Sequence, residues 1–441
     1  MSKKVALHNL GCKVNAYEVE AMQQLLEKAG YEIVPFEEGA DIYLINTCTV
    51  TNIADRKSRQ MLHKAKKMNP NAIVVATGCY VQTDTQKLEE DSAVDLILGN
   101  NQKKQIVEAL EEYEKEHTKK VKVIEINKTK EYEDLSIGYT AEHVRAYIKV
   151  QDGCNQFCTY CIIPYARGRV RSRKIAEVLD EVRALAARGY KEVVLTGIHL
   201  SSYGVDFKEE ERESLLSLIQ AVHEVEGIQR IRLGSLEPRI ITEEFMEGIS
   251  SLPKVCPHFH LSLQSGCDKT LRNMNRRYSA AEYAEKCELI RKFYPAPALT
   301  TDVIVGFPME TEEDFEESYE FVKNIHFYET HIFKYSRRQG TKAAAMEGQL
   351  TEAVKSIRSE KMIALHEIRA KEYETSMIGK TLELLLEEEV EINGKTYFMA
   401  HSKEYVRAVI EKTKDHKVND LVRAKAVDFA DEHVLLAICE E

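Results

Sequence analysis

The sequence predicts an α/β protein with three domains: an N-terminal parallel-sheet α/β domain, a central partial (βα)6 barrel and a C-terminal small five-stranded OB-like β-barrel. Three observations support this fold class. Short apolar runs alternate with helical patterns over residues 1–115 and again over 141–374, which is typical of parallel sheets. A polar stretch at 116–140, rich in Lys, Glu and Thr, separates them as a linker. From residue 375 onward the pattern changes to short strands.

The first domain repeats a strand followed by a helix. Strands are expected at 5–7, 42–45, 73–76 and 94–98, with helices at about 16–29 and 52–68. Asn15 is a suitable N-cap for the first helix, and Gly30 ends it. The strands should therefore lie parallel, joined by right-handed crossovers. One further strand is expected at 121–126, inside the linker.

The central domain continues the same alternation. Strands are expected at 144–150, 192–196, 230–233, 258–263, 299–305 and 330–333, with helices such as 175–187 and 280–293 between them. These units predict an open version of the (βα)8 barrel, ended by a long helix at 351–376. In the last domain, strands are expected at 382–386, 396–399, 405–410, 421–426 and 434–438, with Asn393-Gly394 as a hairpin turn.

Composition and charge limit the function classes. Hydrophobic residues make up 44% and charged residues 30% of the 441 residues, which is typical of a soluble globular protein. No apolar run approaches the roughly 18 residues of a membrane span, and the apolar stretch after the basic start is too short for a signal peptide. We therefore expect a cytoplasmic protein with no membrane partner. In that reducing compartment, its ten cysteines point to metal or catalytic roles rather than disulfides.

Two basic stretches occur in a chain whose formal net charge is −11. The first holds Arg56, Lys57, Arg59, His63, Lys64, Lys66 and Lys67, with no acidic residue between Asp55 and Asp84. In the second, Arg167, Arg169, Arg171 and Arg173 alternate, so an extended strand would point all four the same way. An acidic protein needs such local groups to hold a nucleic acid. The alternative is two ordinary solvated faces.

Cys154, Cys158 and Cys161 lie in the loop after the first expected barrel strand, and barrel active sites lie at the carboxyl ends of strands. A closed [4Fe–4S] cubane needs four thiolates, so three leave one iron open for a substrate. The alternative is a zinc site with His143 or Cys256 as fourth ligand, although the spacing lacks the paired C-x2-C halves of zinc ribbons.

This motif, Cys-x3-Cys-x-aromatic-Cys, resembles that of the radical S-adenosylmethionine (SAM) superfamily, and the resemblance covers about residues 144–376. It implies that the open iron binds the amino and carboxylate groups of SAM. It also implies that electron transfer from the reduced cluster cleaves SAM to a 5′-deoxyadenosyl radical. Such a radical can break unactivated C–H bonds, chemistry that a cofactor must carry.

Cys12, Cys48 and Cys79 each follow one of the first three expected strands. Ligands of open α/β sheets gather at the carboxyl edge of the strands, so these thiols could converge on one site. The alternative is three buried structural cysteines.

The whole chain resembles the methylthiotransferase family, whose members join an auxiliary-cluster domain, a radical SAM barrel and a small RNA-binding barrel called TRAM, here 375–441. The auxiliary motifs correspond to Asn-Leu-Gly-Cys-Lys-Val-Asn at 9–15, Asn-Thr-Cys at 46–48 and Thr-Gly-Cys at 77–79. The resemblance implies two [4Fe–4S] clusters. The one held by Cys12, Cys48 and Cys79 would keep one iron free to carry the sulfur that is methylated and transferred.

The motif Gly-Cys-Lys-Val-Asn at 11–15 resembles the branch that methylthiolates C2 of N6-threonylcarbamoyladenosine 37 in tRNA, with SAM as methyl donor and radical source. The isopentenyladenosine branch reads Gly-Cys-Gln-Met-Asn, and the branch acting on a ribosomal protein aspartate reads Gly-Cys-Pro-Lys-Asn. The implied partners are the tRNA anticodon stem-loop and a reducing electron donor such as flavodoxin or ferredoxin; the sulfur source stays open. The alternative from a different class is a zinc-stabilised RNA-binding protein without catalysis.

Candidate SAM-binding residues lie at the expected strand ends: Gly197, Ser235, Glu237, Gln264 and Gly306. Such glycines could also be turns; the resemblance favours Gly197 and Gly306, because radical SAM enzymes approach the cofactor with backbone at similar places. Arg276 and Arg277 could meet the SAM carboxylate or a phosphate, or form a solvated helix end. In the last domain Tyr397, Phe398 and Tyr405 could stack on bases, or belong to the core.

Overall fold

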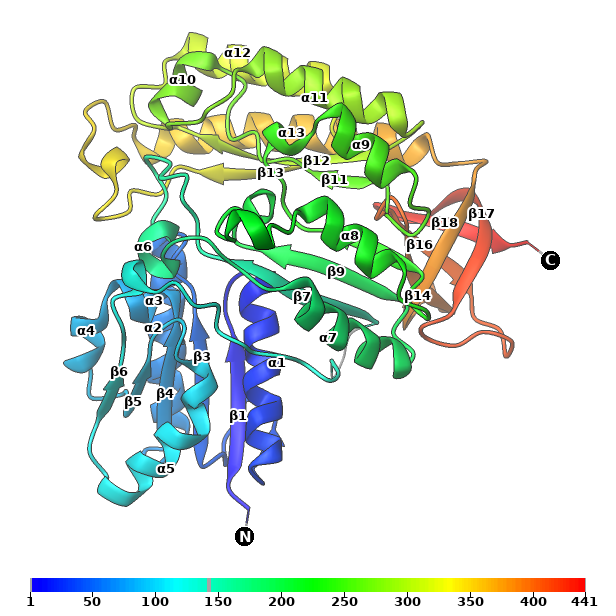
Figure 1. Cartoon of the computed structure of the whole chain (residues 1–441). Coiled ribbons are helices and arrows are strands. Elements are labelled where there is room, and N and C mark those ends of the chain that lie inside the picture. The colour runs from blue at the N-terminus through cyan, green and yellow to red at the C-terminus, as the bar shows by residue number, and fades with distance from the viewer. Residues whose placement is uncertain (1, 141–143, 441) are drawn as a thin grey trace.

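The computed structural model describes residues 2–140 and 144–440, and Figure 1 shows three domains in the predicted order. The described residues confirm the predicted fold class. His143, the alternative zinc ligand, lies outside them. Within them, no helix is both long and apolar enough to cross a membrane.

The N-terminal domain is a parallel sheet between two layers of helices. The strands are ordered β2-β1-β3-β4-β5-β6. Their bounds are β1 (Lys4–Asn9), β2 (Glu32–Val34), β3 (Ile42–Thr47), β4 (Ile73–Gly78), β5 (Leu96–Leu98) and β6 (Lys120–Lys122). Helices α1 (Lys13–Lys28) and α5 (Ile106–Glu116) pack on one face. Helices α2 (Asn52–Met68), α3 (Cys79–Thr83) and α4 (Thr85–Glu89) lie on the other.

The boundary of this domain differs from the prediction. Strand β6 pairs with β5, so the sheet extends beyond the predicted limit at residue 115. The strand expected at 121–126 as part of the linker is shorter in the structure, at Lys120–Lys122, and is joined to the sheet. The rest of the predicted linker is packed rather than free, because Ile126, Leu135 and Ile137 are buried and Tyr17 donates a hydrogen bond to the carbonyl of Leu135.

The central domain is an open barrel of parallel strands. One sheet contains β7 (Arg145–Asp152), β9 (Glu192–Gly197) and β10 (Arg230–Leu233), with a short antiparallel strand β8 (Arg171–Ser172) beside β7. The other contains β11 (His258–His260), β12 (Ala298–Val305) and β13 (Glu329–Lys334). Bridges between Ile231 and Val255 and between Leu236 and Leu261 join the two sheets.

Helices surround this barrel. The short helices are α6 (Ile163–Arg167) and α10 (Asp268–Asn273). The longer ones are α7 (Ile175–Ala187), α8 (Leu215–His223), α9 (Glu243–Ser250), α11 (Ala280–Phe293), α12 (Glu312–Ile325) and α13 (Glu352–Thr375). Helix α1 of the first domain packs against β7 and β9, so the N-terminal domain lies against the β7 side of the open barrel (Figure 1).

The C-terminal domain is a closed barrel in the order β14-β15-β16-β18-β17. Its strands are β14 (Thr381–Ile392), β15 (Lys395–Ser402), β16 (Arg407–Glu411), β17 (Leu421–Asp431) and β18 (Val434–Cys439). Asn393 and Gly394 have φ values of 52° and 75°, so both adopt the left-handed conformation of the predicted hairpin turn.

This domain covers the amino-terminal end of the central barrel. The Arg232 guanidinium donates to Glu192 of β9 at 2.8 Å and to the carbonyls of Ser402 and Lys403. Arg230 donates to Glu383 at 2.9 Å. Charged groups inside the barrel are thus paired across the domain boundary, which leaves the carboxyl ends of the strands as the accessible end.

The backbone just before Cys154 leaves no room for a side chain. Gly153 has a φ of +74°, and a Cβ on it would lie 1.8 Å from the carbonyl oxygen of Arg169. Gly189, after α7, has a φ of +91° but nothing within 4 Å of such a Cβ. Comparing substitutions at Gly153 and Gly189 therefore separates the energetic cost of a left-handed backbone from the cost of a steric clash.

We expect Gly189→Ala to lower the free energy of unfolding of the central domain by about 1–2 kcal/mol, the cost of left-handed backbone for a residue with a Cβ. Gly153→Ala should cost clearly more, because backbone must move as well. Calorimetric comparison of the two variants tests this. Equal destabilisation would show that the close approach at Gly153 is unimportant.

Candidate active site with two cysteine triads

Cys154, Cys158 and Cys161, the barrel triad, lie in the loop between β7 and α6, at the carboxyl end of the first barrel strand. Their thiols are close enough to affect one another. Burial, with a smaller contribution from the Cys158 thiol, raises the pKa of Cys154 to about 11 and that of Cys161 to about 12. The prediction that this loop gathers three thiols is consistent with this geometry.

The loop is held from two sides. The Cys154 N–H donates to the Gly168 carbonyl, and the Thr159 N–H donates to the Met274 carbonyl, both at 3.0 Å. The Asn275 side chain donates to the Phe157 carbonyl at 3.1 Å. Phe157 itself has a φ of 51°, a conformation that persists only where surrounding contacts fix it.

Cys12, Cys48 and Cys79, the N-terminal triad, converge at the carboxyl edge of the first sheet. Cys12, rather than the predicted Asn15, is the N-cap of α1, Cys48 directly follows β3, and Cys79 begins α3 after β4. Burial raises the pKa of Cys48 to about 12, and the thiols of Cys79 and Cys12 contribute to the rise. Gly11, with a φ of +115°, keeps this edge open, since a Cβ there would lie 3.1 Å from the Cβ of Cys48.

The spread of the thiols bears on which metal group each triad fits. The side chains that can bind a metal ion are those of His, Cys, Asp and Glu. In the described part of the chain, three of them bring their ligand atoms within 4.8 Å of one another at one place only, His260, Asp302 and His331. A tetrahedral zinc with Zn–S bonds of about 2.3 Å would hold its sulfurs about 3.8 Å apart. Neither triad has all three of its sulfurs within 4.8 Å of one another, so both are wider than a zinc site and leave room for a larger group such as a cubane. Cys256, the alternative zinc ligand, is buried near Arg232 at the opposite end of the barrel.

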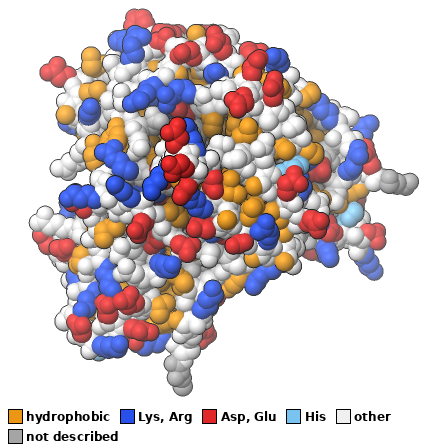
Figure 2. All heavy atoms as spheres, in the orientation of Figure 1, with side chains coloured by type: hydrophobic (Ala, Val, Ile, Leu, Met, Phe, Trp, Pro, Cys, Tyr) orange, Lys and Arg blue, Asp and Glu red, His pale blue; other side chains and the backbone are white. Residues whose placement is uncertain are grey.

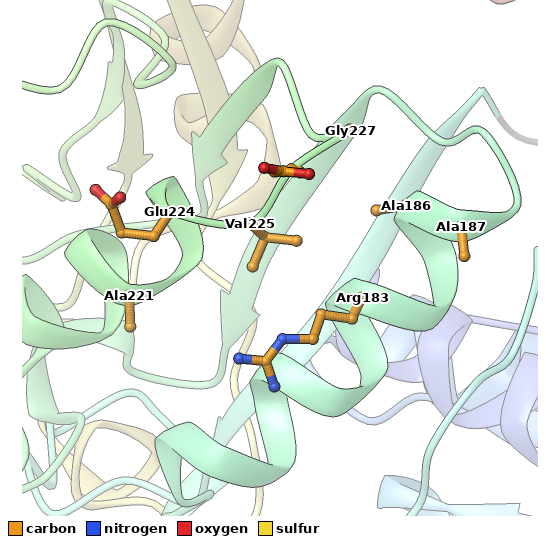
Figure 3. Close-up of a pocket in the computed structure, with 8 residues that line it drawn as sticks. Arg183, Ala186, Ala187, Ala221, Glu224, Val225 and Gly227 are labelled. Carbon is orange, nitrogen blue, oxygen red and sulfur yellow. The ribbon is translucent and has the colours of Figure 1, made fainter.

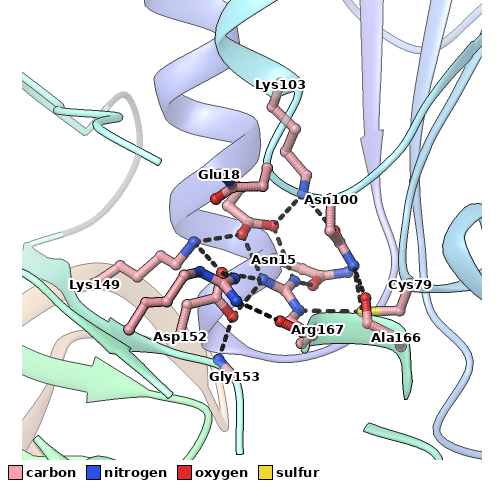
Figure 4. A network of polar contacts seen from close by, with 12 residues as sticks. Asn15, Glu18, Cys79, Asn100, Lys103, Lys149, Asp152, Gly153, Ala166 and Arg167 are labelled. Carbon is pink, nitrogen blue, oxygen red and sulfur yellow. Dashed lines mark hydrogen bonds and ion pairs between the residues drawn. The ribbon is translucent and has the colours of Figure 1, made fainter. Parts of the chain in front are cut away.

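A buried ionic network connects Cys79 of the N-terminal triad with Asp152, which accepts from the Gly153 N–H directly before the barrel triad (Figure 4). Arg167, on the helix after the barrel-triad loop, donates from Nε to the Sγ of Cys79 at 3.2 Å. Its two terminal nitrogens donate to the carboxylate of Glu18 at 2.5 and 2.9 Å. Lys149 pairs with both Glu18 and Asp152 at 2.8 Å, and Lys103 pairs with Glu18 at 3.2 Å.

The cations of this network keep the Glu18 carboxyl group ionised. Although burial alone would raise the pKa of Glu18, Arg167, Lys103 and Lys149 hold it well below its usual range. Glu18 therefore stays ionised at neutral pH. Asn15 also takes part, because its Oδ1 accepts from Arg167 at 2.6 Å while its Nδ2 donates to the Leu10 carbonyl at 2.7 Å.

The prediction that four alternating arginines face an RNA is wrong for three of them. Arg167 and Arg171 are completely buried and Arg173 is 2% exposed; only Arg169 is exposed. The stretch is not one strand, since α6 ends at Arg167 and β8 spans two residues, so strand alternation does not apply. Glu18, Asp152 and Glu181 pair with the three buried arginines.

The basic helix α2 does present an exposed face. Arg56, Lys57, Lys64 and Lys67 are exposed, whereas Lys66 pairs with Asp95. The amino end of α2 is fixed to the loop after β13, where Arg338 pairs with Asp55 at 2.6 Å. Figure 2 shows acidic and basic side chains interspersed over the visible face, so a nucleic acid must rely on such local groups.

A cavity of about 190 Å³ lies beside the barrel triad, next to the segment that follows Cys48. One wall is Val50 and Thr51, which closely follow Cys48; another is the segment 160–163, which includes Cys161. Strand ends of the second sheet complete it: Gln264, Asp302, Ile304 and residues 333–336. A mostly apolar cavity with a few polar groups at the carboxyl ends of barrel strands is the usual place for a small-molecule site.

A larger hollow of about 510 Å³ lies between α7 and the end of α8 (Figure 3). It is lined by Arg183, Glu224 and small residues such as Ala186 and Gly227. None of its lining residues belongs to either triad, so we do not assign the chemistry to it.

The predicted SAM-binding residues differ in their surroundings. Gln264 lines the cavity and has a φ of 73°. Glu237 lies near the barrel triad, because its charge adds to the raised pKa of Cys154. Its carboxylate is held by Arg239 at 2.8 and 3.0 Å. Ser235 is exposed at the end of β10.

The two predicted glycines have packing reasons of their own. A Cβ on Gly306, whose φ is +72°, would lie 2.4 Å from Cγ of Lys355, and its N–H already donates to Glu310 at 2.9 Å. A Cβ on Gly197 would lie 2.8 Å from the side-chain oxygen of Gln151. Arg277 is exposed, whereas Arg276 donates to the Sγ of Cys158 at 3.3 Å.

Sequence reasoning missed a polar row on the barrel wall. His260, Asp302 and His331 come from the adjacent strands β11, β12 and β13. His260 Nε2 lies 3.2 Å from Asp302, and the rings of His260 and His331 stack with centroids 5.7 Å apart. Asp302 also lines the cavity. The signal was the alternation of polar residues within strands expected to be buried.

Family models match two parts of the chain. Residues 4–99 match "Uncharacterized protein family UPF0004", and residues 148–322 match "Radical SAM superfamily". Each match contains one of the triads.

Relatives match nearly the whole chain. Two are named threonylcarbamoyladenosine tRNA methylthiotransferase MtaB. The one from Bacillus subtilis is 42% identical, covering 96% of this chain and 93% of the relative. The one from Aquifex aeolicus is 44% identical over 89% of this chain and 95% of the relative. A Thermoanaerobacter pseudethanolicus relative, 36% identical over 86% of this chain and 81% of its own length, is named tRNA-2-methylthio-N(6)-dimethylallyladenosine synthase.

Solved structures share the fold. The radical SAM methyltransferase TsrM from Kitasatospora setae, with cobalamin and a [4Fe–4S] cluster bound, matches with a TM-score of 0.58 and 16% identity, covering 78% of this chain and 77% of that one. The cobalamin-dependent radical enzyme OxsB matches with a TM-score of 0.51 and 11% identity, covering 84% of this chain and 56% of that one. On the identity and coverage of its relatives, this chain belongs to the radical SAM methylthiotransferase family.

Proposed function

We propose that the protein adds a methylthio group to C2 of N6-threonylcarbamoyladenosine 37 in tRNA, with SAM as methyl donor and radical source. The observation that carries this proposal is a cavity lined by Cys161 of one cysteine triad and by Val50 and Thr51, which closely follow Cys48 of the other. The names of the relatives with 42% and 44% identity support the choice of nucleoside.

In this proposal Cys154, Cys158 and Cys161 hold one [4Fe–4S] cluster, and Cys12, Cys48 and Cys79 hold the other. The width of both triads and the buried cations beside Cys79 fit such groups. With its cluster and SAM bound, the barrel site would supply the 5′-deoxyadenosyl radical that removes a hydrogen atom from C2, while the N-terminal site would supply the sulfur.

The cavity residues would bind and orient the base. Ile304 and Phe333 offer apolar surface on which a flat base can rest, while Gln264 and Asp302 offer polar groups to its edge. Glu237 and Gln264 would contact SAM, since Glu237 lies near Cys154 and Gln264 lines the same cavity as Cys161. Val50 and Ile163 add apolar surface to the lining of the cavity.

The proposed partners are the tRNA anticodon stem-loop, an electron donor such as flavodoxin or ferredoxin, and SAM, in the cytoplasm where the tRNA is found. The basic face of α2 supports RNA contact, because this helix begins next to the cavity wall at Thr51. In the C-terminal domain, proposed to bind RNA, Phe398 is core and Tyr405 lies between Arg145 and Arg232. Tyr397 is left as the partly exposed candidate for stacking.

Iron content tests the assignment of the triads. After anaerobic reconstitution we expect about eight irons per chain, four for each cubane. Replacing Cys154, Cys158 and Cys161 with Ala should leave about four irons and abolish reductive SAM cleavage. Iron and sulfide assays with detection of 5′-deoxyadenosine provide the measurement. Production of 5′-deoxyadenosine by that triple variant would contradict the assignment.

Product analysis tests the reaction and the nucleoside. Wild-type protein with SAM, sulfide and a low-potential reductant should convert N6-threonylcarbamoyladenosine in tRNA to its 2-methylthio form, as seen by nucleoside mass spectrometry. Replacing Cys12, Cys48 and Cys79 with Ala should abolish this product but leave uncoupled SAM cleavage. A 2-methylthio product on isopentenyladenosine instead would assign the protein to the other tRNA branch.

Salt dependence of tRNA binding tests the face of α2. Lys57, Lys64 and Lys67 changed together to Gln should weaken binding and flatten the log–log salt slope by about 0.7–0.9 unit for each phosphate that the protein no longer neutralises. Lys28, Lys115 and Lys130 changed to Gln provide a control with the same charge change at exposed positions outside α2. Equal affinities and slopes for the two variants would exclude a specific role of α2.

A further inference from the structure

Each triad has one sulfur that accepts a hydrogen bond from an arginine. In the N-terminal triad, the Arg167 Nε–H donates to the Sγ of Cys79 at 3.2 Å. In the barrel triad, an Arg276 Nη–H donates to the Sγ of Cys158 at 3.3 Å. The two arginines come from different segments, one from α6 and the other from the stretch after α10. The same contact is thus built twice.

The charges around Arg167 do not balance. Four cations are in the network: Arg167, Lys103, Lys149 and Arg171. Glu18 and Asp152 pair with them directly. The buried carboxyl of Glu133 lies close enough to Lys103 and Lys149 to act as a third acidic group, so even with all three ionised the sum is 4 − 3 = +1. The paired side chains are 0–3% exposed and Glu133 is 7% exposed. Burying uncompensated charge is costly, so an anionic group is expected beside the network. A cubane with a 2+ core and three thiolates carries a net charge of −1, and Cys79 is the point of contact.

The positive charge of Arg276 is also not neutralised by a carboxylate among the described residues. Its other hydrogen bonds go to neutral acceptors, the carbonyl of Ser262 at 3.1 Å and the Tyr278 hydroxyl at 2.8 Å. Its guanidinium lies over the Tyr278 ring, 4.9 Å from the centroid. Among the described residues, no carboxylate forms an ion pair with it within 4.0 Å, so a cluster-bound Cys158 sulfur would be the anionic acceptor of its hydrogen bonds.

We propose that Arg167 and Arg276 are positioning residues directed at sulfur, each donating to one thiolate of its triad and raising the reduction potential of the cluster held there. Reduction of a cubane adds one electron and makes the cluster more negative. Positive charge and N–H···S hydrogen bonds therefore stabilise the reduced form more than the oxidised form. The inference rests on the proposed two-cluster function.

The test uses full-length protein with one cluster at a time. Arg276→Gln is made in the background with Cys12, Cys48 and Cys79 replaced by Ala, and Arg167→Gln in the background with Cys154, Cys158 and Cys161 replaced by Ala. Each cluster is titrated anaerobically with dithionite through mediators and followed by electron paramagnetic resonance. We expect the equilibrium constant for reduction to fall at least tenfold, which for one electron is about 59 mV to more negative potential.

Three controls separate a tuning role from a structural one. Arg173→Gln removes a buried arginine that pairs with Glu181 and contacts no thiol, so neither potential should move. Arg276→Gln, made also in the background with Cys154, Cys158 and Cys161 replaced by Ala, should leave the potential of the N-terminal cluster unchanged. Arg167→Lys keeps a cation for Glu18 but removes the Nε donor, and should shift the potential in the same direction as Arg167→Gln. This variant decides the Arg167 case if Arg167→Gln does not fold.

The outcomes are distinct. A parent background without about four irons and a cubane signal would refute the two-cluster function itself. In a second outcome, the parent backgrounds carry their clusters while the arginine variants shift the reduction potential no more than Arg173→Gln does. That result would overturn the role of the two arginines and leave the two-cluster function intact. Shifts restricted to the cluster whose thiolate each arginine contacts would establish it.

Discussion

The pairing of Arg167 with Glu18 is the interaction on which the arrangement of the molecule depends. Glu18 belongs to α1, which begins at Cys12, and Arg167 ends the helix that follows the Cys154–Cys161 loop. The pair is completely buried, and it extends through Lys149 and Asp152 into β7. Breaking such a pair by removing one partner typically costs about 3–5 kcal/mol, whereas an apolar replacement of both can be neutral. We therefore interpret the network as a structural one that fixes the position of one triad relative to the other across the domain boundary.

The other domain contacts follow from the open shape of the barrel. An open barrel leaves one lateral side and one end without cover. Helix α1 packs on β7 at the side, and the C-terminal barrel covers the amino-terminal end through Arg230 and Arg232. What stays accessible is the carboxyl end of the strands, where the cavity beside the barrel triad lies. Under the proposed function, the substrates would enter at this end, which neither of the other domains covers.

The sequence was sufficient for features that depend on local pattern. Apolar runs, turn residues and the position of cysteines after strands predicted most of the strands, the hairpin at Asn393-Gly394 and the convergence of Cys12, Cys48 and Cys79. The short strands β2 and β8 were not predicted. It was insufficient wherever partners far apart in sequence decide the outcome. Arg167, Arg171 and Arg173 have the alternation of an exposed strip, yet Glu18, Asp152 and Glu181 draw them inside. Gly306 resembles a cofactor contact, yet Lys355 explains its missing side chain. The row of His260, Asp302 and His331 exists only once three strands align.

Burial of these arginines changes how an acidic protein can hold RNA. Buried cations that contact thiols or cross the domain boundary cannot also neutralise phosphates, so under the proposed function more of that role would fall to the exposed face of α2. Its position is fixed, because Arg338, from the loop after β13, pairs with Asp55 and donates to Thr49. Val50 and Thr51, between Thr49 and the start of α2, are themselves cavity wall. A strand of RNA whose phosphates lie along α2 would therefore meet the cavity at a fixed point. The same kind of buried arginine–carboxylate pair that sets the distance between the triads also sets the direction from which a nucleotide can reach them.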